Sequence, residues 1–168
     1  MTSPGEADRH PRVLALADRF RCVDAAMRDL PVYNAKVGIE AIGFRPFAAD
    51  ALAGVVLTPW FMNLIVLPLQ PVPMDMAAIG RTSVIELPAG QRTFVVGGDD
   101  VIGLYKAHSL HSPVLNFTLP GQAQAEARRM LALLMTPPAQ APLAVGGGAN
   151  DGAPGLDRRA LLLGRRTA

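Results

Sequence analysis

The chain has 168 residues, half of them hydrophobic and only 18% charged, which suits a folded domain and argues against a disordered chain. Its net charge of +2 arises near the end, where Arg158, Arg159, Arg165 and Arg166 outnumber two aspartates. The remainder is neutral and carries no basic stripe interleaved with aromatic residues, so nucleic-acid binding is not indicated. A single cysteine, Cys22, excludes a disulfide framework and fits a reducing compartment.

The first thirty residues divide into a polar leader and a helix. Residues 1–10 lack the apolar stretch of a secretory signal, so we expect a disordered leader. Apolar residues then recur at steps of three and four from Val13 to Leu30. This spacing predicts a helix of about five turns that begins at Pro11 and ends before Pro31.

The next hundred residues favour strands. Apolar alternation between turn residues predicts five of them, over 37–47, 52–57, 61–67, 83–87 and 92–96. Asp99 is a candidate cap for a short helix that runs to Leu110, although Gly103 weakens it. Ala, Gln, Glu, Arg and Leu dominate Gly121–Met135, which predicts a second long helix.

The longest uncharged run, Ala51–Met74, contains the only tryptophan. It is about long enough to cross a bilayer as a helix. Pro59 and Asn63 argue against this, as do the β-branched residues and flanks without excess Lys or Arg. We therefore expect two buried strands joined at Thr58-Pro59.

These elements predict an α+β fold, with a mostly antiparallel sheet of about five strands packed by the long N-terminal helix and the C-terminal helix. The expected single domain spans residues 11–136. Residues 137–168, rich in Pro and Gly, predict a flexible tail that contains the motif RRALLL.

Candidate catalytic and metal-binding residues are few. His108, Ser109, His111 and Ser112 cluster in sequence, but no nucleophile elbow surrounds either serine, and two histidines fall short of a zinc site. We therefore expect no catalytic residues, no metal and no cofactor. A small metal-dependent or hydrolytic enzyme using His108–Ser112 stays open as the alternative function.

An interaction surface is the remaining candidate. Trp60, Phe61 and Met62 are adjacent, so on a strand their apolar side chains point to both faces. Most of these side chains are expected in the core, and a part that is exposed is a candidate binding surface. Asn63 needs a hydrogen-bond partner if it is buried, and a partner protein's backbone is one candidate.

Four stretches, taken in order, resemble one family. They are RDLPVYNAKVGIEAIGFRPF (28–47), LTPWFMNLIVLP (57–68), ELPAGQRTFVVG (86–97) and IGLYKAHSLHSP (102–113). Their succession is similar to the HybE/HupJ/HoxT family of nickel–iron hydrogenase assembly chaperones.

The resemblance implies a cytoplasmic, non-enzymatic chaperone. Its expected partner is an immature small or large subunit of an uptake hydrogenase, held before twin-arginine export, with the twin-arginine signal peptide as a further candidate. No nucleic acid and no membrane span are expected. We predict that the client contacts Trp60, Phe61, Met62, Asn63, Ser109, Ser112 and Pro113.

The resemblance also bears on the tail. The sequence around Arg158, Arg159, Leu161 and Leu162 is similar to the twin-arginine export motif S-R-R-x-F-L, although Asp157 replaces the serine. With no apolar region after it, the motif is not itself an export signal. One hypothesis is that it mimics a client signal peptide and occupies the domain's own peptide site; the alternative is a disordered basic tail.

Overall fold

The structure is a computed structural model that describes residues 5–139. The described residues up to Pro138 form one compact unit. Its elements in chain order are η1 (Ala7–Arg9), α1 (Pro11–Met27), β1 (Glu40–Ala48), β2 (Ala51–Leu57), β3 (Met62–Pro68), β4 (Thr82–Leu87), β5 (Gly90–Asp99), β6 (Gly103–His111) and α2 (Gln122–Leu134).

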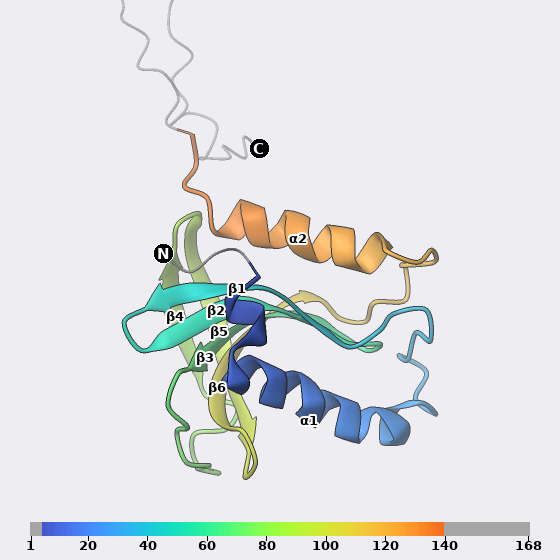
Figure 1. The fold of residues 1–168 in the computed structure, drawn as a ribbon, viewed down its shortest axis with the longest axis horizontal. Coiled ribbons are helices and arrows are strands. Elements are labelled where there is room, and N and C mark those ends of the chain that lie inside the picture. Colours follow the sequence, from blue (N-terminus) through green and yellow to red (C-terminus); the bar gives the residue numbers. More distant parts are fainter. Residues whose placement is uncertain (1–4, 140–168) are drawn as a thin grey trace, which may run out of the picture. The chain divides into compact units, whose positions relative to one another are not determined.

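The strands form one sheet in the order β1-β2-β3-β6-β5-β4, and every neighbouring pair is antiparallel. The helices α1 and α2 lie on opposite faces of this sheet (Figure 1). The predicted α+β class is therefore confirmed. The expected number of about five strands is one short, because β6 was predicted as a helix.

The segment that follows Asp99 shows why. The Asp99 carboxylate accepts hydrogen bonds from the N–H groups of Val101 and Ile102, as a helix cap would. These bonds instead close the turn between β5 and β6, where Gly103 has a φ of 78°. The chain then returns as β6 between β5 and β3, and pairing on both sides outweighs the local helix signal.

The predicted disordered leader is also wrong for its last residues. Residues 7–9 form η1, and Ala7 is buried against the core. The Asp8 carboxylate accepts hydrogen bonds from Gly43 N–H at 3.1 Å and from Phe44 N–H at 2.6 Å. No local pattern indicates this contact, because the partners of Asp8 lie 35 and 36 residues further along the chain.

The uncharged run forms two central strands, as expected. All seven residues of β2 are buried, and β3 is buried from Leu64 to Leu67. Between residues 5 and 139 there is no helix with the length and apolar character that a membrane crossing requires.

Two hydrophobic cores share this sheet. One lies under α2 and includes Val55, Leu64 and Leu131; the other lies under α1 and includes Leu16 and Ile65. The α1 side depends on one glycine. A Cβ on Gly54 would meet the ring of Phe44 at 2.4 Å, so only glycine lets that ring lie across β2.

Candidate functional site

The predicted surface at Trp60–Asn63 begins in the turn between β2 and β3. Thr58 organises this turn: its Oγ1 accepts hydrogen bonds from the N–H groups of Trp60 and Phe61 and donates one to the Phe61 carbonyl. Trp60 is 9% exposed and its ring stacks on Tyr33, while Phe61 packs edge-on against Phe20. Both rings therefore help to hold the turn and α1 in place.

The two parts of the predicted surface, residues 60–63 and residues 109–113, lie side by side. In the pairing of β3 with β6, Asn63 lies opposite Ser109 and Met62 opposite His111. Ser109, Ser112 and Pro113 are exposed, whereas Met62 is fully buried. Asn63 Oδ1 is buried and has no hydrogen-bond partner in the described part of the chain. Met62 thus offers a partner no surface in this conformation, and the role of the other residues stays a prediction.

The tail residues of the predicted site lie outside the part that the structure describes. These are Arg158, Arg159, Leu161 and Leu162.

The histidine and serine cluster is not arranged for catalysis. His108 Nδ1 lies 2.9 Å from the carbonyl oxygen of Thr93, and His111 Nε2 lies 3.1 Å from Glu126 Oε1. Since side chains alternate along β6, Ser109 lies on the opposite face from His108. Among residues 5–139 no group of three His, Cys, Asp or Glu is placed to hold a metal ion. Nothing in this arrangement favours the enzyme alternative.

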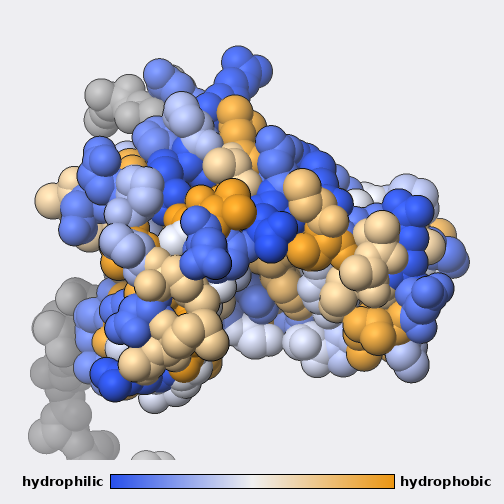
Figure 2. Space-filling model, turned by 90° about the horizontal axis from the view of Figure 1, so that it is seen from below, coloured by the Kyte–Doolittle hydropathy of each residue, from blue (hydrophilic) through white to orange (hydrophobic). Residues whose placement is uncertain are grey.

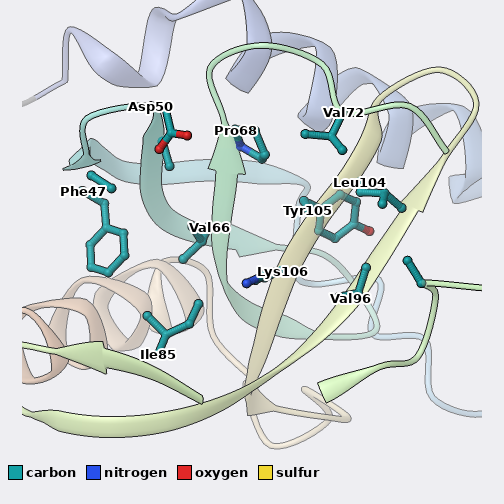
Figure 3. A pocket seen from close by; sticks show the side chains of 13 residues that line it. Phe47, Asp50, Val66, Pro68, Val72, Ile85, Val96, Leu104, Tyr105 and Lys106 are labelled. Carbon is teal, nitrogen blue, oxygen red and sulfur yellow. The ribbon is translucent and has the colours of Figure 1, made fainter. Parts of the chain in front are cut away.

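A different site, which sequence reasoning missed, is an apolar groove on the α2 side of the sheet. We define it by Phe47, Val66, Val72, Ile85 and Val96, with a volume of about 380 Å³. These side chains come from β1, β3, the segment after β3, β4 and β5, and they surround one open space (Figure 3). Volume and lining are typical of a ligand- or peptide-binding groove.

The groove remains open because α2 does not extend over it. Helix α2 contacts β1 and β2, and its last carbonyl, on Leu134, accepts a hydrogen bond from Ala89 in the β4–β5 turn. The groove lies around Val66 and Pro68, where β3 ends, whereas the predicted surface lies around Met62, where β3 begins. The seven residues of β3 span about 20 Å, so the groove is separate from the predicted surface at Met62.

Polar side chains are sparse in the groove. Asp50 lies at its rim, on the turn between β1 and β2, and Lys106 lies beside Val66 on the neighbouring strand. The Tyr105 ring packs against the core under α1, on the opposite face of the sheet from Lys106, and there burial, and to a smaller extent the charge of Asp99, raise the pKa of its phenol. The groove therefore suits apolar groups, with Lys106 available to an anion.

The side of the molecule opposite the groove exposes its apolar residues in a different way. Figure 2, seen from below the view of Figure 1, shows apolar residues in separate patches among hydrophilic ones. Scattered exposed apolar side chains are normal on a protein surface.

Comparison with known proteins supplies the family. Residues 11–164 match the family described as "[NiFe]-hydrogenase assembly, chaperone, HybE". The chain belongs to this family. The match spans more than the described domain, and the resemblance seen in the sequence is confirmed.

Named relatives agree with this assignment. The chain is 42% identical over 123 residues to the hydrogenase expression/formation protein HupJ of Bradyrhizobium diazoefficiens, covering 73% of this chain and 70% of HupJ. It is 36% identical over 166 residues to HoxT of Cupriavidus necator, covering 92% and 89%. The hydrogenase-2 operon protein HybE of Escherichia coli K12 is 28% identical over 146 residues, covering 84% and 82%.

The solution structure of HybE from Escherichia coli has a similar fold. The TM-score is 0.59 at 24% identity, and the alignment covers 100% of this chain and 98% of that one. The family is one of nickel–iron hydrogenase assembly chaperones, not of enzymes.

Proposed function

We propose that this protein holds an immature subunit of a nickel–iron hydrogenase, small or large, in the cytoplasm until the subunit is ready for twin-arginine export. The apolar groove carries the proposal. An assembly chaperone must cover apolar surface that its client has not yet buried, and burial of such surface is the main driving force for association.

The groove fits this task better than the surface around Trp60. Trp60 and Met62 are already used by the protein's own core, so they have little area left for a client. Val72 is 41% exposed and Ile85 is half-buried, so a client that docks here gains apolar contacts without unfolding the chaperone. The exposed residues Ser109, Ser112 and Pro113 stay a predicted second contact.

The test is recovery of hydrogenase subunits with the tagged full-length protein from cells that produce the hydrogenase. Val72→Asp places a charge in the groove, which an apolar client would have to desolvate. We expect recovery to fall by about tenfold, the effect of roughly 1.4 kcal/mol. Val101→Asp is the matched control, because Val101 is 71% exposed and lies outside the groove.

Each subunit is tested as a precursor with and without its signal peptide, which identifies the client and the part that is bound. If the unmodified protein recovers neither subunit, the proposed function is wrong. If Val72→Asp and Val101→Asp recover the same amount as the unmodified protein, the groove is not the client site.

A further inference from the structure

The two edges of the sheet are protected to different degrees. At the edge formed by β1, Asp8 occupies the N–H groups of Gly43 and Phe44, and the pairing with β2 shifts register on either side of Arg45 and Pro46. Proline and irregular pairing are devices by which proteins prevent another strand from adding to an edge.

The other edge, β4, has none of these devices. Its six residues contain no proline, and its pairing with β5 runs without a shift from Thr82 to Leu87. The Val96 N–H donates to the carbonyl of Arg81, and Leu87 closes the hairpin opposite Gly90. Since hydrogen-bonded pairs alternate in an antiparallel ladder, Thr82, Val84 and Glu86 direct their N–H and C=O groups away from β5.

A strand added at this edge would find apolar contacts on both faces of the sheet. On the α2 face its side chains would lie beside Ile85, which lines the groove. On the other face they would lie beside Val84, which is 61% exposed, with Val95 one strand further in and 44% exposed. An extended segment that is apolar on both faces is therefore the best fit.

Charges on the groove side point to an acidic partner. Alternation along the strands places Arg81, Arg92 and Lys106 on the same face as Ile85, and Arg81 aligns with Lys106 across Val96. Within residues 5–139, none of the ion pairs includes any of these three cations. They are thus available to a carboxylate, whereas the arginine pair of an export signal would be repelled.

We propose that β4 captures its client by strand addition, and that the client segment is an extended apolar stretch with a carboxylate beside it. The inference rests on the proposed function, since it specifies which part of an immature subunit is held. Main-chain hydrogen bonds to Thr82, Val84 and Glu86 supply affinity, and the groove with its cations selects the side chains.

The test uses the full-length protein and a fluorescein-labelled peptide of sequence GDVTVIVTSG, with binding followed by fluorescence anisotropy. Val84→Pro removes an N–H that faces solvent, so β4 still pairs with β5 but cannot accept a further strand. Val84→Ala keeps this N–H and shortens the side chain. We expect affinity to fall about tenfold or more for Val84→Pro, and by clearly less for Val84→Ala.

Thr82→Pro is a second variant in case Val84→Pro does not fold, because its N–H also faces solvent and it begins the strand. Equal affinity of unmodified protein and proline variants would overturn strand addition, as would equal losses in Val84→Pro and Val84→Ala. A third outcome would also overturn strand addition by a client. In it the peptide fails to bind, the unmodified protein sediments as a dimer, and Val84→Pro separates that dimer into monomers, which would mean that a second copy of the chain occupies β4.

The charge is tested with a peptide that has Asn in place of Asp and with Lys106→Ala. We expect the change of peptide to weaken binding to the unmodified protein and to matter less in Lys106→Ala. Equal affinity for both peptides would overturn the requirement for a carboxylate. If unmodified and Val84→Pro proteins recover equal amounts of subunit from cells, strand addition is wrong although the proposed function stands.

Discussion

Glu126 is the residue through which α2 holds the end of β6. Its Oε1 lies 3.1 Å from His111 Nε2, and Arg129 donates to both carboxylate oxygens at 2.7 Å. The hydrogen bonds from Arg129 are the largest cause of a lowered Glu126 pKa. Burial raises this pKa and the hydrogen bond with His111 lowers it further, and together these effects give a pKa of about 2. The ionised carboxylate is thus favoured in the folded state.

The folded-state pKa of Glu126 lies below its ordinary 4.5, so its stabilisation is fully present above about pH 4.5 and is lost as the pH falls toward 2. At pH 7 we expect Glu126→Gln to lower the free energy of unfolding by about 1 kcal/mol or less, since Arg129 is 57% exposed. In urea unfolding this difference should shrink as the pH falls through that window.

Arg129→Gln serves as the companion variant. It removes the largest cause of the low pKa, so the carboxylate should protonate at a higher pH than in the unmodified protein. A difference between Glu126→Gln and the unmodified protein that stays constant from pH 7 to strong acid contradicts the assignment.

At the scale of elements, local patterns predicted most of the fold. Alternation of apolar residues located five strands, and Pro59 correctly marked the turn between β2 and β3. These two strands are buried on both faces of the sheet, so they carry no charged residues, and the proline between them marks where one ends and the next begins. The sixth strand was missed because Asp99 and Gly103 carry the same signals at a turn as at a helix. Long-range pairing decided between the two.

The candidate site was much less predictable. Residues from all six strands and from the segment between β3 and β4 line the groove, and none of them is unusual in its own segment. Trp60 and Phe61 attracted attention as aromatic residues, yet both pack within the protein. The groove is open because α2 ends before it covers that part of the sheet. The pattern of a single sequence does not show which part of a sheet a helix will cover.

The contact between η1 and β1 gives a prediction at this scale. Asp8→Ala leaves the N–H groups of Gly43 and Phe44 without their acceptor at a sheet edge. We expect the free energy of unfolding to fall by roughly 1–3 kcal/mol, measured by urea denaturation. Asp18→Ala, at an exposed position of α1, should cost about 0.5 kcal/mol or less. Equal losses would show that η1 does not anchor β1.

For the whole domain, the shared sheet determines how it unfolds. Leu16 belongs to the core under α1 and Leu131 to the core under α2, and both cores rest on β2 and β3. Neither core can lose its sheet without exposing the other. We therefore expect one cooperative transition, as is usual for domains below about 150 residues.

Leu16→Ala and Leu131→Ala should each lower the free energy of unfolding by about 2–5 kcal/mol, because both side chains are at most 2% exposed. Trp60, the only tryptophan, reports the β2–β3 turn by fluorescence, while far-UV circular dichroism reports all elements. The two signals should change together in both variants. The opposite result would be two separate transitions, in which the circular dichroism of one helix is lost before the fluorescence changes. It would mean that the two cores unfold independently and that the core under α2 unfolds while the core under α1 stays folded.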